Sequence, residues 1–215
     1  GILSSEPELG EDLSRLFNEL SGHSAKHDYS RILVAPHSLR KGLLFRIKRE
    51  TKNHLEGKTA WIRLKLNSLL DEEIIAALYE AANAGVKIEI IVRGICALQF
   101  STQAQRDNIK VRSILGRFLE HSRIYYFKND GAEEYYIGSA DVMHRNLDRR
   151  VEALVRIDAE KHKSRLRGIL DDSVSENYST WSLLDDNQWQ RKARDFDGNL
   201  LVNFQDYFVE KHNRA

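Results

Sequence analysis

The sequence predicts an α/β fold in which helices flank a mixed β-sheet, and three observations lead to that prediction. Residues 60–66 alternate in hydrophobicity with a period of two, which is typical of a strand. A helix expected over 72–84 and an apolar strand over 86–92 come next, and this order favours a parallel, right-handed crossover. Asn129-Asp130-Gly131 separates two aromatic runs and predicts a hairpin, which adds antiparallel strands.

The N-terminal elements are predicted from spacing and stop signals. Apolar residues at helical spacing predict a helix over 9–20, and Gly22 ends it. The polar residues 23–29 predict a linker. Residues 31–35 predict a short buried strand, and Ser38 can cap the helix that follows.

Further along, Asp71 caps the expected 72–84 helix and Gly85 ends it. The tail after Trp181 is polar and aromatic without a clear period, so we expect it to wrap the surface. The remaining expected elements are strands over 109–114, 124–127, 135–137 and 151–157 and a helix over 161–170.

Composition limits the classes of function. Thirty-three Lys and Arg nearly balance 32 Asp and Glu, so an anion site has to be built locally from a few arginines. Cys96 is the single cysteine, which excludes an internal disulfide and a multi-cysteine zinc site and suits a reducing compartment. Walker, Rossmann and His-Glu-x-x-His motifs are absent from the sequence.

The residues best suited to chemistry surround the predicted hairpin. His121 and Arg123 lie two apart at a strand entrance, so their side chains share one face. The returning strand brings Ser139 near Arg123 and Asp141 near His121. Such a group can hold a phosphoryl oxygen, and the carboxylate can fix the imidazole tautomer. The alternative is a structural histidine at a strand end.

These residues resemble the His-x-Lys and Gly-Ser-x-Asn motifs of the phospholipase D superfamily, with Arg123 in place of lysine and Asp141 in place of asparagine. The resemblance implies a phospholipase-D-like mixed sheet flanked by helices. Arginine does not replace lysine neutrally, because its planar fork grips oxygens in pairs.

Longer segments resemble the C-terminal region of polyphosphate kinase, the enzyme that moves phosphate between ATP and a polyphosphate chain. The resemblance spans nearly the whole chain up to about residue 160. It implies that 1–28 is the end of a preceding half-domain with a linker, and that 29–215 is the C-terminal phospholipase-D-like catalytic half-domain. The segments are Ala84–Ile88, Ile91–Leu98, Val111–Ile114, Gly116–Arg123 and Asn146–Glu152.

The resemblance also implies roles for individual residues. Arg93 and His121 match positions that contact the nucleotide, and Arg150 matches an arginine that faces its phosphates. We add Arg123 as a further phosphate-binding candidate. His121 is the catalytic candidate, with a proton-shuttling or charge-stabilising role opposite a phosphohistidine that lies upstream of Gly1. Magnesium is expected in the full enzyme, with its ligands outside this chain and no metal site within it.

Some residues depart from the family pattern or allow a plainer interpretation. Val142 and His144 stand where the family has Trp and Pro, and residues 99–107 diverge from its Arg-Pro-Gly-rich loop. We expect these changes to affect the shape of the loop and the binding of the polyphosphate chain more than the transfer of phosphate. Lys65 and Asn67 could line the site or serve the structure alone.

We therefore expect an ATP–polyphosphate phosphotransferase fragment, inactive alone, whose partners are ATP or ADP, polyphosphate and the upstream domains. No nucleic acid partner is expected. The full-length form is expected to be a cytoplasmic homo-oligomer, with attachment to a membrane as an open alternative. One rival is a phospholipase-D-type phosphodiesterase or nuclease. Another is a non-catalytic phosphate-binding domain.

Overall fold

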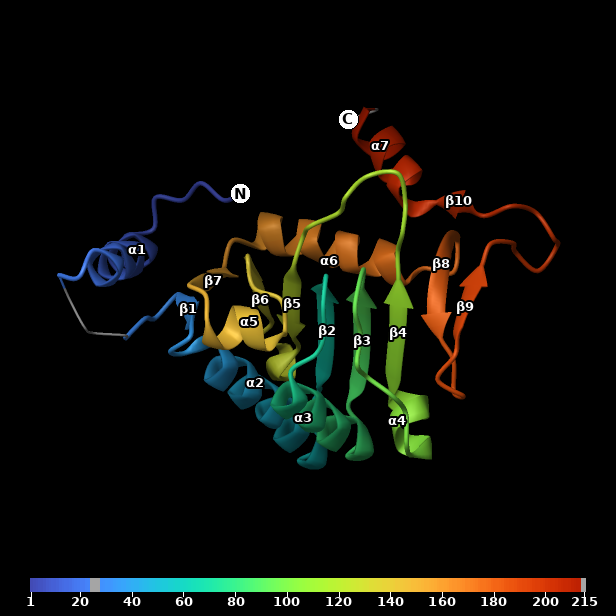
Figure 1. The fold of residues 1–215 in the computed structure, drawn as a ribbon, viewed down its shortest axis with the longest axis horizontal. Helices are drawn as coiled ribbons and strands as arrows, with labels where there is room; N and C mark the ends of the chain where they lie inside the picture. The colour runs from blue at the N-terminus through green and yellow to red at the C-terminus, as the bar shows by residue number, and fades with distance from the viewer. Residues whose placement is uncertain (24–27, 214–215) are drawn as a thin grey trace.

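The computed structural model describes residues 1–23 and 28–213 and contains a ten-stranded mixed sheet with helices on both faces (Figure 1). The sheet order is β1-β7-β6-β5-β2-β3-β4-β8-β10, and β9 pairs with β8 off this path. The predicted fold class is confirmed. The strands are β1 (Ile32–Ala35), β2 (Trp61–Leu66), β3 (Lys87–Val92), β4 (Ile109–Ser113), β5 (Ile124–Phe127), β6 (Glu134–Gly138), β7 (Glu152–Ile157), β8 (Tyr178–Leu183), β9 (Trp189–Lys192) and β10 (Val202–Asn203).

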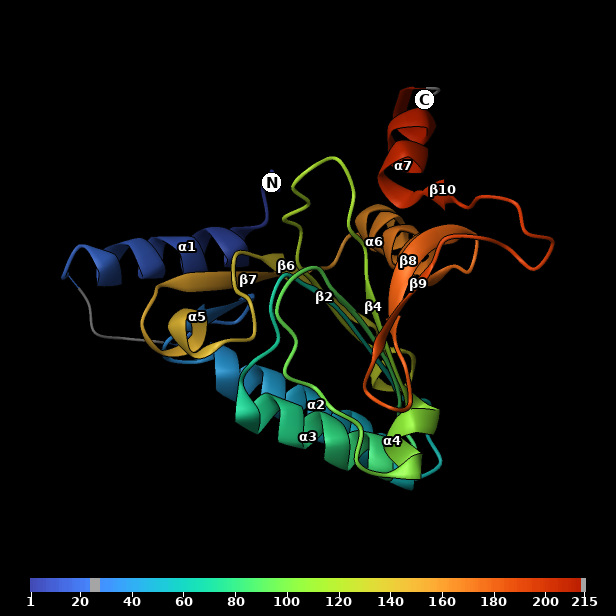
Figure 2. The same cartoon turned by 45° about the vertical axis from the view of Figure 1, so that its right-hand side comes forward.

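Helices cover both faces of this sheet. Figure 2 shows α2 and α3 on one side and α6 on the other. Apolar side chains of α2 and α3 pack with inward-facing residues of the central strands, and Leu170 of α6 packs against the opposite face. The helices are α1 (Pro7–Leu20), α2 (Leu39–Leu55), α3 (Glu72–Asn83), α4 (Gln103–Asn108), α5 (His144–Asp148), α6 (Glu160–Val174) and α7 (Phe204–Asn213).

Local signals in the sequence account for the central elements. β2 and β3 are parallel, as the strand–helix–strand pattern predicts, and β4 pairs parallel to β3. The Asp71 carboxylate accepts the Ile74 N–H at 3.1 Å and caps α3. The β5–β6 hairpin turns through Asn129 and Asp130, both with positive φ, as its Asn-Asp-Gly sequence predicts.

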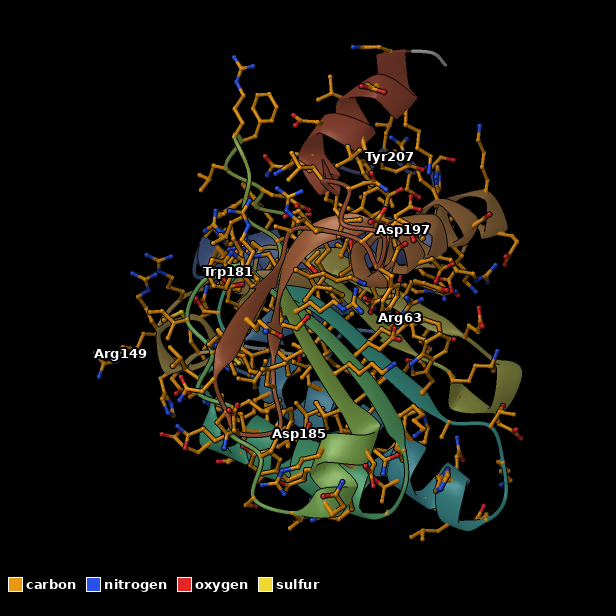
Figure 3. The ribbon with its side chains drawn as sticks, turned by 90° about the vertical axis from the view of Figure 1, so that its right-hand side faces the viewer. Arg63, Arg149, Trp181, Asp185, Asp197 and Tyr207 are labelled. Atoms are coloured by element: carbon orange, nitrogen blue, oxygen red, sulfur yellow. The ribbon has the colours of Figure 1, made fainter. Side chains whose placement is uncertain are left out.

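A buried arginine joins the sheet to α6 (Figure 3). The Arg63 side chain on β2 is 2% exposed and lies over the Trp61 ring, 4.5 Å from its centroid. Its guanidinium pairs with Glu89 of β3 at 2.8 Å and with Asp171 of α6 at 2.6 Å. A buried cation needs such partners, so this group fixes α6 on the sheet.

The C-terminal tail differs from its prediction. Instead of wrapping the surface, β8 pairs with β4 and extends the sheet, and β9, β10 and α7 follow. The pairing supplies backbone hydrogen-bond partners to the edge of β4. Because it joins residues far apart in the sequence, local periodicity does not reveal it. The short helices α4 and α5 were not predicted either; α4 begins with a Thr102–Gln105 capping box inside the divergent 99–107 segment.

The N-terminal helix packs at the β1 edge. Leu9 and Leu16 contact a small cluster with Ile32, Val34 and Val155. Of the predicted 23–29 linker, residues 24–27 lie outside the described residues. Among the described residues no helix has the length and apolar character needed to cross a membrane.

Candidate functional site

Strand directions bring all four candidate residues to one edge of the sheet. Since β2, β3 and β4 are parallel, their carboxyl ends meet there, and Arg93 follows β3. β5 is antiparallel to β2, so His121 and Arg123 precede it at the same edge. β6 ends there before Asp141, and β7 begins there after Arg150. Ligand sites of α/β sheets open at such carboxyl ends.

The Asp141 carboxylate is the anchor of the site. Its Oδ1 accepts the Asn67 backbone N–H at 2.8 Å and the Ser68 N–H at 3.4 Å. Arg123 donates to it in a two-pronged pair, from Nε to Oδ1 at 3.1 Å and from Nη2 to Oδ2 at 2.8 Å. Burial by itself would raise the pKa of Asp141, but these hydrogen bonds and the Arg123 charge hold the pKa below its usual value. The carboxylate therefore stays ionised and pairs with a buried guanidinium.

Arg123 connects this anchor to the histidine. Its Nη1 lies 2.9 Å from His121 Nδ1 and donates to the His121 carbonyl oxygen at 2.9 Å, and Nη2 lies 3.3 Å from His121 Nε2. A guanidinium has five N–H groups and accepts no hydrogen bond. Its contacts to Asp141 and His121 engage all of its nitrogens, so Arg123 orients the ring rather than offering free donors. Which ring nitrogen accepts from Arg123 depends on the tautomer of the imidazole.

This arrangement corrects one expectation about the carboxylate. We expected Asp141 to lie near His121 and to fix the imidazole tautomer directly. In the structure its oxygens bind Arg123 and the backbone after β2, and the guanidinium stands between carboxylate and imidazole. The reason is the length of arginine, which reaches across the hairpin from the strand entrance.

His121 opens toward two neighbouring cavities. One, of ≈ 580 Å³, is lined by His121, Arg123 and Ser139 together with the N-terminal residues Gly1 and Ile2. The other, of ≈ 470 Å³, lies between His121 and the aromatic side chains of α7. Both have the size of ordinary small-molecule sites. The exposed imidazole thus stands where a ligand can reach it.

Arg93 and Arg150 lie at the same edge without bonding to this cluster. Arg93 is half-buried, and its Nη1 is buried with no hydrogen-bond partner among the residues that the structure describes. An unpaired buried donor is costly, which makes this nitrogen available to an incoming anion. Arg150 is half exposed, and its Nη1 lies 3.9 Å from Glu152. Arg149 beside it projects away from the body of the protein (Figure 3).

Two contacts at the site have no counterpart in the sequence reasoning. Lys65 is nearly buried and its Nζ pairs with Glu120 at 2.6 Å, next to His121. Gln205 binds the backbone of Phe118 through both ends of its amide. Neither pairing has a local signal, because 55 and 87 positions separate the partners. Within the described ranges no group of three or more His, Cys, Asp or Glu side chains could hold a metal ion.

The fold and the cluster define the class. The structure superposes on a phospholipase D family member from Salmonella typhimurium with a TM-score of 0.50 at 16% identity, over 75% of this chain and 97% of that one. A likeness at this identity concerns the fold alone. The chain is thus a phospholipase-D-like α/β domain with a His–Arg–Asp cluster at the carboxyl edge of its parallel strands.

Closer similarity identifies the family within that class. Residues 32–203 match the family model described as polyphosphate kinase C-terminal domain 2. Polyphosphate kinase from Streptomyces coelicolor is 48% identical over 100% of this chain, and that from Mycobacterium avium is 45% identical over 99%. The crystal structure of polyphosphate kinase from Porphyromonas gingivalis superposes with a TM-score of 0.87 at 32% identity, over 99% of this chain and 33% of that one.

The chain belongs to the polyphosphate kinase C-terminal domain family. It spans 29% of the length of the Streptomyces relative and 28% of the Mycobacterium avium relative.

Proposed function

We propose that this chain forms the C-terminal catalytic part of an enzyme that transfers the terminal phosphate of ATP to polyphosphate, reversibly and through a phosphohistidine carried upstream. The observation that supports this most is the edge of the sheet itself. There the Asp141–Arg123 pair holds His121, and Arg93 presents a guanidinium nitrogen that has no hydrogen-bond partner within the described part of the chain. Phosphoryl transfer depends on such positioning and charge neutralisation.

Each residue then has a distinct role. Arg93 and Arg150 bind phosphate oxygens of the nucleotide. His121 exchanges a proton with, or stabilises charge on, the group that moves between ATP and the upstream histidine. Arg123, proposed first as a phosphate ligand, serves this reaction by orienting His121, because its nitrogens are already bonded within the protein. Residues 1–28 would then be the end of the preceding half-domain with its linker, and 29–215 the C-terminal half-domain.

The remaining features concern the whole enzyme. ADP is the product of the forward reaction. Mg²⁺ neutralises the phosphates in such transfers, and its ligands would come from the substrate and from protein outside this chain. We place the full-length enzyme in the cytoplasm as a homo-oligomer, in solution or attached to a membrane.

The test is the His121→Ala variant of the full-length protein. Polyphosphate synthesis from ATP should fall by roughly 10²–10⁴-fold, the usual contribution of a positioned proton-transferring group. Circular dichroism should stay unchanged, and thermal unfolding should shift only by the loss of the ring's contacts to Arg123, because the exposed imidazole contributes little packing. Replacement of exposed His162 by Ala is the matched control. Wild-type synthesis by His121→Ala, or ATP binding without any turnover by the unmodified protein, would contradict the proposal.

A further inference from the structure

His121 is carried by a long connection that has little structure of its own. Residues 114–123 join β4 to β5 without a helix or strand and arch over the edge of the sheet (Figure 1). Phe118 and Leu119 are more than half exposed there. A connection of this kind samples many conformations unless side chains elsewhere hold it. The position of His121 therefore depends on what anchors these residues.

One anchor comes from the C-terminal helix. The Gln205 side chain accepts the Phe118 N–H at 2.7 Å through Oε1 and donates from Nε2 to the Phe118 carbonyl at 2.8 Å. Both backbone polar groups of one residue, Phe118, are thus bound by a single side-chain amide, and Gln205 is only 7% exposed. Asn203 holds the Gln205 backbone in turn, because its Oδ1 accepts the Gln205 backbone N–H at 2.8 Å.

Gly116 makes room for this anchor. A Cβ at position 116 would lie 2.3 Å from Gln205 Oε1 and 3.0 Å from Asn203 Oδ1. Its φ is not in the left-handed region, so the backbone would accept alanine, and the close approach of the Gln205 and Asn203 amides is what opposes a side chain there. Because Gly116 has no side chain, the Gln205 amide can occupy the space beside it.

A second anchor comes from β2. Lys65 is 4% exposed and its Nζ pairs with Glu120 at 2.6 Å, while Ser122 Oγ donates to the same Glu120 oxygen at 2.8 Å. The two anchors thus hold residues 118 and 120, three positions and one position before His121. Arg123 holds residue 121 itself through the carbonyl.

We propose that Gln205 and Lys65 are positioning residues for His121, and that they keep residues 114–123 in the conformation that presents the imidazole to the transferred phosphate. The inference rests on the proposed function. It adds to that function a dependence of the reaction on the C-terminal helix, a segment just beyond the residues that match the family model.

The experiment uses the full-length protein with Gln205→Met, which keeps the length of the side chain and removes both hydrogen bonds. We expect kcat for polyphosphate synthesis to fall at least tenfold, since small misplacements of a reacting group cost up to about 10²-fold. KM for ATP should change less than about threefold, because Arg93 and Arg150 are untouched. Gln190→Met on exposed β9 is the matched control and should keep the wild-type kcat.

Lys65→Met should lower kcat in the same way as Gln205→Met. A wild-type kcat in either of these two variants would show that the substituted residue does not position His121.

Gly116→Ala reaches the same anchor from the loop side. Its methyl group should displace the Gln205 amide and lower kcat to a similar extent, and it keeps the proposal testable if Gln205→Met fails to fold. The Gly116→Ala, Gln205→Met double variant should lose no more kcat than the stronger single variant, because both break one contact. Losses that multiply would overturn the proposal.

Hydrogen exchange separates this inference from the proposed function. Amides of residues 116–121 should exchange faster in Gln205→Met and Gly116→Ala than in the wild type and in Gln190→Met. Faster exchange with an unchanged kcat would overturn the positioning role while leaving the proposed function intact. A wild-type protein that makes no polyphosphate would refute the proposed function, whatever the exchange rates.

Discussion

Replacing Arg123 by lysine separates the charge at this position from its geometry. The guanidinium makes two hydrogen bonds to the Asp141 carboxylate and contacts both ring nitrogens and the carbonyl of His121. An ammonium group keeps the charge and at most one of the carboxylate bonds. The change removes one hydrogen bond to a buried ion, worth about 1.5–3 kcal/mol, and one weaker bond to His121, worth about 0.5–1 kcal/mol. We expect the local free energy of opening to fall by about 2–4 kcal/mol.

Hydrogen exchange measures this loss where it arises. The Asn67 and Ser68 amides donate to Asp141, so their exchange should accelerate roughly 30- to 900-fold at 1.36 kcal/mol per tenfold change. Polyphosphate synthesis by the full-length Arg123→Lys variant should fall at least tenfold, because His121 loses its orienting contact.

The control is Arg149→Lys, since the Arg149 side chain is exposed and projects into solvent (Figure 3). It should leave exchange and synthesis unchanged. Wild-type exchange at Asn67 and Ser68 together with wild-type synthesis in Arg123→Lys would refute the reasoning, because charge alone would then suffice at this position.

Two further predictions concern the strands around the site. The lowered pKa of Asp141 means that its stabilising contribution is complete above its ordinary pKa of 3.8 and is lost as pH falls through the lowered value. Asp141→Asn should therefore lower the free energy of unfolding by about 3 kcal/mol at pH 7, and urea unfolding should show this difference shrinking below pH 3.8. A difference independent of pH would contradict the ion pair. Gly138→Ala places a methyl group 1.9 Å from the Ala153 carbonyl oxygen, so β6 and β7 must separate, at a cost of about 3 kcal/mol. A methyl group at position 168 in α6 would meet nothing within 4 Å, so Gly168→Ala should raise the free energy of unfolding slightly. Equal changes in the free energy of unfolding for Gly138→Ala and Gly168→Ala would contradict the close packing of β6 against β7.

The elements that follow local rules were predictable from the sequence. The 60–92 segment has a period-two strand, an Asp71 cap and a stop at Gly85, and it forms the parallel β2–α3–β3 unit. The Asn-Asp-Gly turn forms the β5–β6 hairpin. Short-range patterns specify such units because their stabilising contacts lie close in sequence.

The site was predictable in its members but only partly in its contacts. The hairpin gathers His121, Arg123 and Asp141 on one patch, as the sequence predicts, but Asp141 pairs with Arg123 and the guanidinium stands between carboxylate and imidazole. Which of two polar groups a carboxylate binds depends on side-chain reach and burial, and spacing along the chain does not record either. The Gln205–Phe118 contact and the pairing of β8 with β4 are long-range and leave no periodic signal.

The location of the covalent phosphate tests the central claim most directly. Full-length protein would be incubated briefly with ATP labelled at its terminal phosphate, and the labelled peptides identified by mass spectrometry under conditions that preserve phosphohistidine. We predict that the label lies on a histidine outside these 215 residues and that His121→Ala slows its onward transfer to polyphosphate. Phosphohistidine at position 121 would contradict the account, because His121 would then be the nucleophile rather than its partner.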